Sequence, residues 1–216
     1  MRDFKLYVIT DERFHPGRNL FEVIEEAMAG GADIVQLRDK KSSKKEVLEK
    51  ARELRRLTER YGVQFIVNDY IDVAMAVDAD GIHLGQDDLP LEEARRILGA
   101  EKIIGISTHS LEQAKEAESG GGDYIGVGPV FSTGTKEDVV DPVTPHYVRE
   151  AAANIKIPFV AIGGIKLHNV DQVLNAGAKR ICAVSEIVGS FDVAGTCRQF
   201  LKKINQAGRV ENEADD

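Results

Sequence analysis

The sequence has few of the features that mark membrane, disulfide-rich secreted or zinc-binding proteins. Its two cysteines, Cys182 and Cys197, have neither metal-ligand spacing nor the density of a disulfide framework. No apolar run approaches the roughly 20 residues that a membrane-spanning helix needs. Residues 1–11 lack the apolar stretch and cleavage site of a signal peptide. We therefore expect a cytoplasmic protein with reduced cysteines and no membrane partner.

Positive charge is also in short supply. The 216 residues include 28 Lys and Arg against 36 Asp and Glu, a formal net charge of −8 at pH 7. A broad nucleic-acid surface needs clustered positive charge, so nucleic acid is not expected as a partner. A small phosphorylated ligand remains compatible with this charge, because it responds to a few local charges and backbone amides rather than to the total.

What the sequence does have is a regular alternation of β-branched runs and amphipathic segments. We predict strands over residues 5–10, 33–38, 65–68, 81–85, 103–108, 124–128, 158–162 and 180–185. We predict helices over 19–29, 43–61, 71–77, 90–98, 111–119, 145–153, 169–175 and 193–206. This order predicts parallel strands with helices outside them. Eight such units favour a closed (β/α)₈ TIM barrel in a single α/β domain, 1–207, followed by an acidic, disordered tail, 208–216.

An open, doubly wound sheet is the alternative architecture. Its dinucleotide-binding form carries a GxGxxG fingerprint after the first strand, and no such motif stands there in this sequence. The closed barrel is therefore preferred. In a barrel the functional residues lie at the carboxyl ends of the strands, whatever the chemistry.

Polar residues follow the second strand with a spacing of two. Gln36, Arg38 and Lys40 occupy alternate positions, while Val35 and Leu37 stand between them. Because side chains alternate between the two faces of a strand, Gln36 and Arg38 point into the barrel when Val35 and Leu37 face the helices. The alternative interpretation is a salt-bridged barrel rim with a purely structural role. However, a barrel interior seldom holds a Gln–Arg pair without a function.

Carboxylates follow the third and fourth strands. Asp69 comes after Asn68, and Asp88 closes the run Gly85-Gln86-Asp87-Asp88. Adjacent strand ends would bring Asp69 and Asp88 together, and two carboxylates can hold a hard cation such as Mg²⁺. The alternative for Asp88 is a helix N-cap before Pro90. Arg38 and Lys40 nearby favour a metal-bound anion at this part of the rim.

Three later strands end in residues that suit anions. The loop after the sixth strand, 128–136, is either a mobile anion-binding loop or an ordinary turn-rich one. Gly163-Gly164 and Ser185 follow the seventh and eighth strands, where barrels often bind phosphate through backbone amides. We expect one phosphate near Gly164 and Ser185. The histidines, including His83 and His109, are interpreted as core, loop or cap residues.

Seven motifs stand in order along the chain, and together they resemble the thiamine phosphate synthase family. The resemblance as a whole runs in order from about Leu6 to Ile204. The motifs are Gln36-Leu37-Arg38-Asp39-Lys40, Asn68-Asp69, His83-Leu84-Gly85-Gln86-Asp87-Asp88, Gly128-Pro129-Val130-Phe131, Thr133-Gly134-Thr135-Lys136, Ala161-Ile162-Gly163-Gly164-Ile165 and Val184-Ser185-Glu186-Ile187.

The resemblance implies a transferase that joins two small molecules. They are 4-amino-2-methyl-5-hydroxymethylpyrimidine diphosphate and 4-methyl-5-(2-hydroxyethyl)thiazole phosphate, and the products are thiamine phosphate and pyrophosphate. The implied path is a dissociative, Mg²⁺-assisted substitution. Such a path needs no protein nucleophile, in agreement with the lack of a nucleophile–base constellation in the sequence.

The resemblance also assigns roles to individual residues of this sequence. The metal ligands are Asp69 and Asp88. The catalytic residues, which handle the diphosphate or the departing pyrophosphate, are Arg38, Lys40, Ser107 and Lys136. The residues that hold the pyrimidine diphosphate are Gln36, Arg38, Lys40 and Asn68, and those that line the thiazole phosphate pocket are Thr133, Thr135, Gly164, Ser185 and Ile187.

Two other functions share this fold and part of this pocket. One is a thiazole tautomerase-like barrel, which typically lacks the full diphosphate and metal set. The other is a non-catalytic protein that binds thiamine phosphates. The presence of Arg38, Lys40, Asn68, Asp69 and Asp88 favours the synthase. A homo-oligomer is compatible with the sequence, which does not fix the number of subunits.

Overall fold

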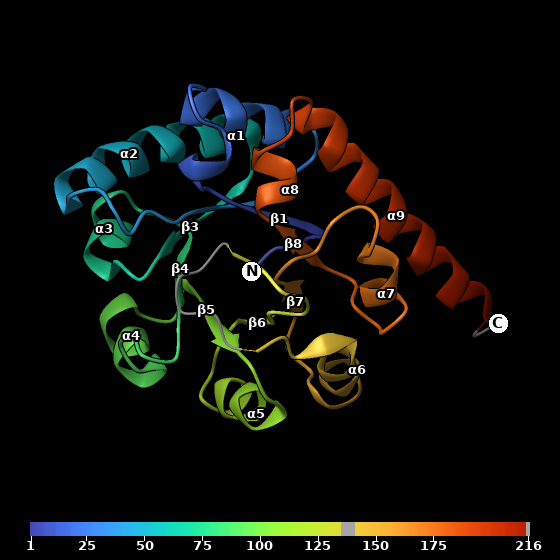
Figure 1. Cartoon of the computed structure of the whole chain (residues 1–216). Helices are drawn as coiled ribbons and strands as arrows, with labels where there is room; N and C mark the ends of the chain where they lie inside the picture. The colour runs from blue at the N-terminus through green and yellow to red at the C-terminus, as the bar shows by residue number, and fades with distance from the viewer. Residues whose placement is uncertain (135–140, 215–216) are drawn as a thin grey trace.

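Eight parallel strands close into a barrel in the computed structural model, which describes residues 1–134 and 141–214 (Figure 1). Each strand pairs with the next in the chain, and β8 pairs with β1. The strands are β1 (Leu6–Ile9), β2 (Ile34–Leu37), β3 (Gln64–Asn68), β4 (Gly81–Leu84), β5 (Ile103–Thr108), β6 (Tyr124–Val127), β7 (Phe159–Ile162) and β8 (Ile181–Ala183). The predicted TIM barrel is confirmed.

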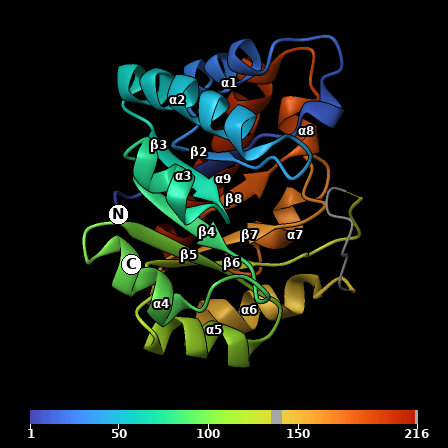
Figure 2. The same ribbon diagram turned by 90° about the vertical axis from the view of Figure 1, so that its left-hand side faces the viewer.

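Helices surround the barrel, with α1 and α2 on one side and α4, α5 and α6 on the opposite side (Figures 1 and 2). They are α1 (Leu20–Ala29), α2 (Lys44–Tyr61), α3 (Ile71–Ala76), α4 (Leu91–Leu98), α5 (Leu111–Ser119), α6 (Thr144–Asn154), α7 (Val170–Leu174), α8 (Ser185–Val188) and α9 (Val193–Ala214). A short 3₁₀ helix, η1 (Glu12–Phe14), follows β1. None of the described helices combines the length and apolar character needed to cross a membrane.

Local sequence explains where the longer helices begin and end. Ser43 accepts from the Glu46 backbone amide, and the Glu46 carboxylate accepts from the Ser43 amide, so a capping box starts α2. Gly62 ends the same helix in the left-handed region, at φ 66° and ψ 26°, where a side chain would be strained.

The final helix differs from our expectation. We expected a helix over 193–206 and a disordered tail from residue 208, but α9 runs from Val193 to Ala214. The predicted domain boundary at residue 207 therefore does not coincide with the end of a helix. Disorder of the acidic tail, 208–216, stays a prediction. The short helices η1 and α8 were not predicted either, since each is too short to show a 3.6-residue period.

Strand alternation sorts the core into two clusters. Leu6 and Val8 pack in the large cluster between the strands and the helices. Tyr7 and Ile9, on the other face of β1, belong to a smaller cluster inside the barrel. The hydroxyls of Tyr7 on β1 and Tyr124 on β6 lie 2.8 Å apart, although these strands are not neighbours, so both side chains cross the barrel interior.

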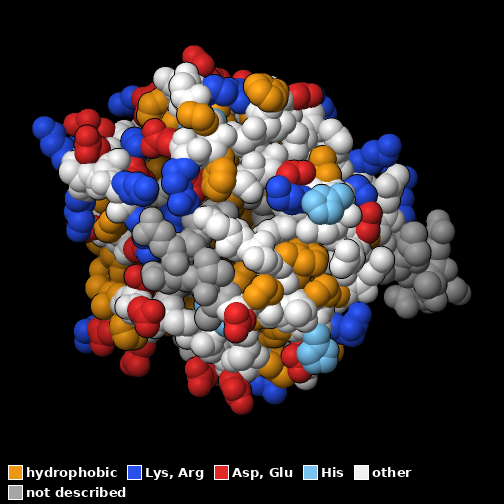
Figure 3. Space-filling model, viewed as in Figure 1, with side chains coloured by type: hydrophobic (Ala, Val, Ile, Leu, Met, Phe, Trp, Pro, Cys, Tyr) orange, Lys and Arg blue, Asp and Glu red, His pale blue; other side chains and the backbone are white. Residues whose placement is uncertain are grey.

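The predicted orientation of β2 is confirmed. Val35 and Leu37 lie in the outer cluster, and Ile34 lies in the inner one. Gln36 donates to the Tyr7 hydroxyl inside the barrel. On the face seen in Figure 3, the Lys and Arg side chains are interspersed with Asp and Glu, so positive charge is local rather than spread over a broad patch.

Candidate active site

Two adjoining cavities lie at the carboxyl ends of the strands. The inner cavity is lined by residues of all eight strands, among them Tyr7, Gln36, His83, Ser107, Val160 and Cys182. The rim cavity is lined by residues that follow the first five strands, among them Lys40, Asp69 and Asp88. The residues that line both cavities are Asp11, Arg38, Asn68, Ser107 and His109. The two cavities therefore share a wall and can hold two connected ligands.

The inner cavity has an apolar side and a polar end. Ile9, Val160 and Ile162 contribute side chains to it, and Gly164 and Ser185 line it at the ends of β7 and β8. Gly164 has φ 61°, and a Cβ placed on it would lie 2.6 Å from the Ser132 carbonyl oxygen. Only glycine lets the two loops approach this closely. An apolar wall beside backbone amides suits a ring that carries a phosphate.

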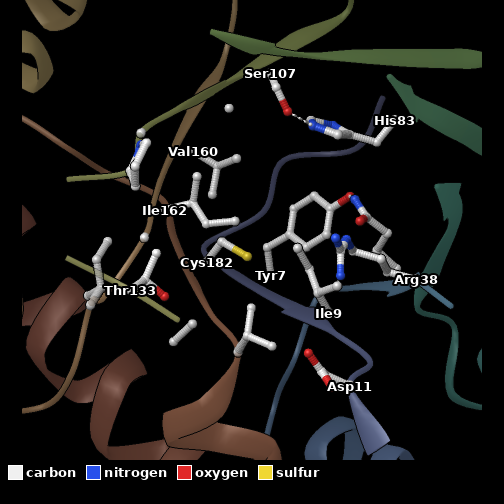
Figure 4. A pocket seen from close by; sticks show the side chains of 18 of the residues that line it. Tyr7, Ile9, Asp11, Arg38, His83, Ser107, Thr133, Val160, Ile162 and Cys182 are labelled. Carbon is white, nitrogen blue, oxygen red and sulfur yellow. Dashed lines mark hydrogen bonds between the residues drawn. The ribbon is translucent and has the colours of Figure 1, made fainter. Parts of the chain in front are cut away.

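Arg38 lies where the cavities meet, on the side opposite Thr133 (Figure 4). Its backbone is held by Thr10, whose Oγ1 accepts from the Arg38 amide at 2.9 Å. Its half-buried guanidinium has no hydrogen-bond partner among the described residues. The guanidinium can therefore donate two parallel hydrogen bonds to a pair of phosphate or diphosphate oxygens.

The rim cavity holds two carboxylates and a lysine. Burial raises the pKa of Asp69 above its ordinary value, and the neighbouring Asp88 raises it further. Lys40 opposes this effect, with its Nζ 3.3 Å from Asp69 Oδ2. Asp88 is fixed by the Gly85 amide, which donates to its Oδ2 at 2.6 Å. Two carboxylates crowded in this way would be relieved by a cation between them.

The donor set fits Mg²⁺. This ion is usually held by one or two carboxylates together with substrate phosphates and water, rather than by a complete protein cage. Asp69 and Asp88 supply that pair, and the residues described contain no group of three or more Asp, Glu, His or Cys side chains that could enclose a metal. Asp69 also adopts φ 61°, a strained value for a residue other than glycine.

Asp39 lies in the same sequence motif as Arg38 and Lys40, but its carboxylate is engaged in hydrogen bonds with other residues of the protein. Its Oδ2 accepts from Lys50 Nζ at 2.8 Å, and its Oδ1 accepts from the Lys41 and Ser42 amides at 3.0 Å. Burial alone would raise the pKa of Asp39, but these hydrogen bonds outweigh it and hold the pKa below its ordinary value. Asp39 therefore stays ionised and shapes the loop after β2.

The Ser107 side chain is hydrogen-bonded to His83. Its Oγ lies 2.9 Å from His83 Nε2, and Figure 4 shows this bond at the edge of the inner cavity. His83 Nδ1 in turn lies 2.9 Å from the Tyr124 hydroxyl, so His83 is hydrogen-bonded as expected, but it is half-buried and lines the inner cavity rather than lying in the core. His109 donates from Nδ1 to the Gly128 carbonyl oxygen at 2.5 Å and lines both cavities.

Most of the predicted site residues meet at the two cavities. Those that line the inner cavity are Gln36, Arg38, Asn68, Ser107, Thr133, Gly164 and Ser185, and those that line only the rim cavity are Lys40, Asp69 and Asp88. Thr135 and Lys136 lie outside the described residues. Ile187 is different, because its side chain is fully buried in the outer cluster and does not line either cavity.

Sequence reasoning missed Asp11 and Arg13. Arg13 donates from Nε to Asp11 Oδ1 at 2.8 Å and from Nη2 to Oδ2 at 2.5 Å, and both residues line the rim cavity. Burial would raise the pKa of Asp11, but Arg13 and the nearby charge of Arg38 lower it overall. The only available signal was the position of these residues just after the first strand.

A sequence model described as thiamine monophosphate synthase matches residues 6–187. The chain belongs to this thiamine monophosphate synthase family. Its site is therefore that of a transferase, and the resemblance carried by the seven motifs is confirmed.

Relatives within the thiamine monophosphate synthase family match nearly the whole chain. A thiamine-phosphate synthase of Halalkalibacterium halodurans is 67% identical over 208 residues, which cover 96% of this chain and 99% of that protein. One of Shouchella clausii is 60% identical over 97% of this chain and 100% of that protein. The solved structure of a thiamine phosphate pyrophosphorylase from Pyrococcus furiosus has a TM-score of 0.86 and 41% identity, and the match covers 94% of this chain and 96% of that one.

Proposed function

We propose that the chain is a thiamine phosphate synthase. It joins 4-amino-2-methyl-5-hydroxymethylpyrimidine diphosphate to 4-methyl-5-(2-hydroxyethyl)thiazole phosphate and releases thiamine phosphate and pyrophosphate. The observation that carries this proposal is the shared wall of the two cavities, where Arg38, Asn68 and Ser107 line both. A reaction between a diphosphate and a ring with its own phosphate needs two such subsites that meet at one point.

The linings suit the two substrates. In the inner cavity, Ile9, Val160 and Ile162 would cover the thiazole ring, and Gly164 and Ser185 would hold its phosphate. Thr133 lines the same cavity. Thr135 and Lys136, outside the described residues, keep the roles that the resemblance implies.

The pyrimidine diphosphate would lie across the shared wall. Gln36 and Asn68 offer amide groups to the polar edge of the aminopyrimidine, and Arg38 and Lys40 face the diphosphate. In this arrangement the methylene carbon would lie between the leaving diphosphate in the rim cavity and the thiazole nitrogen in the inner cavity.

The reaction then depends on the positioning of the two substrates and on the stabilisation of developing charge. It needs no nucleophilic side chain. The bond between the methylene carbon and the diphosphate oxygen breaks, and its electron pair leaves with pyrophosphate. The aminopyrimidine delocalises the positive charge that forms on the methylene carbon. The thiazole nitrogen donates its lone pair to that carbon, which forms the new C–N bond. Arg38, Lys40 and Ser107 stabilise the charge that develops on the leaving group.

Asp69 and Asp88 would hold Mg²⁺, which supplies charge neutralisation to the diphosphate when it is bound. The Asp69 carboxylate also keeps the ammonium of Lys40 at the rim, because Lys40 Nζ lies 3.3 Å from Asp69 Oδ2. Lys40 can therefore move from Asp69 toward a diphosphate oxygen without crossing an apolar surface.

The rim cavity separates the synthase from the two other functions. A thiazole tautomerase-like barrel or a thiamine phosphate binding protein would use the inner cavity alone. Neither accounts for the guanidinium of Arg38, which has no hydrogen-bond partner among the described residues, next to the Asp69–Asp88 pair. A cytoplasmic location and a homo-oligomeric state stay predictions.

The direct experiment incubates purified protein with Mg²⁺ and both precursors and follows thiamine phosphate by chromatography. We expect product only when both precursors are present. A protein that isomerises a thiazole carboxylate phosphate but forms no thiamine phosphate would be a tautomerase. One that binds thiamine phosphate without turnover would be a binding protein. Either result would overturn the synthase proposal.

A further inference from the structure

A continuous chain of hydrogen bonds crosses the barrel beneath the inner cavity. Gln36 Nε2 donates to the Tyr7 hydroxyl at 2.7 Å, and the Tyr7 hydroxyl lies 2.8 Å from that of Tyr124. The Tyr124 hydroxyl lies 2.9 Å from His83 Nδ1, and His83 Nε2 lies 2.9 Å from Ser107 Oγ. We call this chain the relay. Its two ends, Gln36 and Ser107, are both residues that we assign to substrate.

The centre of the relay is closed to water. Tyr7 and Tyr124 are buried to 1% and 0% exposure, and Phe4 packs edge-on against both rings from the inner cluster. Burial raises the pKa of each tyrosine above its ordinary value, so both hydroxyls keep their protons. In a buried site, a hydrogen-bond donor without an acceptor costs free energy. Each tyrosine hydroxyl has a single proton, so it must donate that proton to one neighbour.

Glycine makes room for the relay. A Cβ on Gly105 of β5 would lie 2.1 Å from Tyr124 Cζ, so the ring of Tyr124 occupies the space of a missing side chain. The register places Gly105 beside His83 of β4 and Tyr124 of β6. The ring of Tyr124 therefore lies over Gly105 of β5, with its hydroxyl against His83 of β4 and Tyr7 of β1.

The direction of hydrogen-bond donation along the relay follows from its Gln36 end. An amide nitrogen can only donate, so Tyr7 accepts from Gln36 and must give its own proton to Tyr124. Tyr124 then gives its proton to His83 Nδ1, which leaves the proton of a neutral imidazole on Nε2. His83 Nε2–H donates to Ser107 Oγ, and the Ser107 proton has to point elsewhere.

We propose that this relay, with Tyr7, Tyr124 and His83 as positioning residues, locks the Ser107 hydroxyl as a donor aimed at the leaving diphosphate. Ser107 lines both cavities, so its proton is available where the two substrates meet. A donor fixed before the reaction stabilises developing negative charge without reorganising. This inference rests on the proposed function for the identity of the anion, but the direction of the relay is a property of the protein alone.

The decisive measurement is the tautomer of His83 in the whole protein without substrates. Long-range ¹H–¹⁵N NMR at about pH 8, where an ordinary imidazole is neutral, distinguishes a proton on Nε2 from one on Nδ1. The signal is assigned by its loss in His83→Gln. We expect the Nε2–H tautomer. With the Nδ1–H tautomer, His83 would donate to Tyr124 and accept from Ser107, which would overturn the proposal.

Tyr7→Phe tests the role of the relay in turnover. This change removes the link between Gln36 and Tyr124, so we expect a mixture of His83 tautomers and a kcat reduced about tenfold, as for other residues that orient a catalytic group. Tyr147→Phe is the matched control. Tyr147 is 3% exposed, and its hydroxyl lies 2.7 Å from both Thr108 Oγ1 and the Ser110 carbonyl oxygen, but it belongs to the outer cluster.

The two variants separate positioning from general stability. If Tyr7→Phe keeps both the tautomer and the kcat of the Tyr147→Phe control, the relay has no role in orienting Ser107 and the proposal is wrong. Absence of product from the wild-type protein would instead overturn the proposed function, while the tautomer of His83 would still decide the direction of the relay.

Discussion

Lys40 Nζ lies 3.3 Å from Asp69 Oδ2, beside the pair formed by Asp69 and Asp88. The lysine only partly offsets the effect of burial and of the second carboxylate, because the pKa of Asp69 remains raised. A divalent cation between the two carboxylates would correct this imbalance.

Replacing Asp88 by Asn should damage turnover and not the fold. The amide oxygen can still accept from the Gly85 amide, but one negative charge is lost at the proposed metal site. We expect kcat to fall on the order of 100-fold, with a higher Mg²⁺ requirement. The free energy of unfolding should be unchanged or slightly higher, because the repulsion from Asp69 is removed.

Mg²⁺ titrations of activity and urea unfolding measure these two effects. Asp72→Asn is the control, because Asp72 is exposed and pairs with Lys44 on the outer surface. A wild-type Mg²⁺ dependence in Asp88→Asn would remove Asp88 from the metal site.

Arg38→Ala should weaken the binding of the pyrimidine diphosphate more than that of the thiazole phosphate. The guanidinium lies where the cavities meet, and a charge-assisted bond to an anion contributes about 1.5–3 kcal/mol. We therefore expect KM for the pyrimidine diphosphate to rise by roughly 10- to 100-fold. The control is Arg96→Ala, at an exposed position of α4 paired with Glu93. Equal KM values for the pyrimidine diphosphate in Arg38→Ala and Arg96→Ala would contradict a role of Arg38 in binding the diphosphate.

Gly164→Ala should affect the thiazole phosphate. Its φ of 61° disfavours alanine, and the new Cβ would lie 2.6 Å from the Ser132 carbonyl oxygen. Gly17→Ala is a matched control, because Gly17 has φ 78° but open space around it. Both variants should lose about 1–2 kcal/mol of stability from backbone strain. Only Gly164→Ala should raise KM for the thiazole phosphate; a similar rise in Gly17→Ala would point to general destabilisation.

Asp39→Asn should reduce stability at neutral pH and have less effect in acid. The folded pKa of Asp39 lies below its ordinary value of 3.8, because hydrogen bonds from Lys50 and the loop outweigh the effect of burial. A lowered pKa stabilises the fold above the unfolded value and loses this contribution as the pH falls toward the folded value. Urea unfolding should show a loss of about 1–2 kcal/mol at pH 7, shrinking below about pH 4. An equal loss at pH 7 and pH 3 would exclude this linkage.

The sequence predicted the fold and the facing of β2 because both depend on short-range periodicity. The alternation from Ile34 to Arg38 determines which side chains enter the barrel, and the structure has Gln36 inside and Val35 and Leu37 outside. The meeting of Asp69 and Asp88 was predictable for a related reason, since both follow neighbouring parallel strands.

Other parts of the site depend on contacts that a sequence pattern does not reveal. The pairing of Tyr7 with Tyr124 joins residues 117 positions apart across the barrel, and nothing in either local segment indicates it. Ile187 was placed in the pocket by resemblance, but the unpredicted helix α8 turns its side chain into the outer cluster. Asp11 and Arg13 lie in the equally short η1 region, which has no period to detect.

The measurement that tests the central claim most directly is the stoichiometry of products from the wild-type protein. With Mg²⁺ and both precursors, thiamine phosphate and pyrophosphate should appear in equal amounts, and omission of either precursor should abolish both. Pyrophosphate release without thiamine phosphate, or no product above background, would contradict the assignment of the two cavities to the two substrates of one transfer reaction.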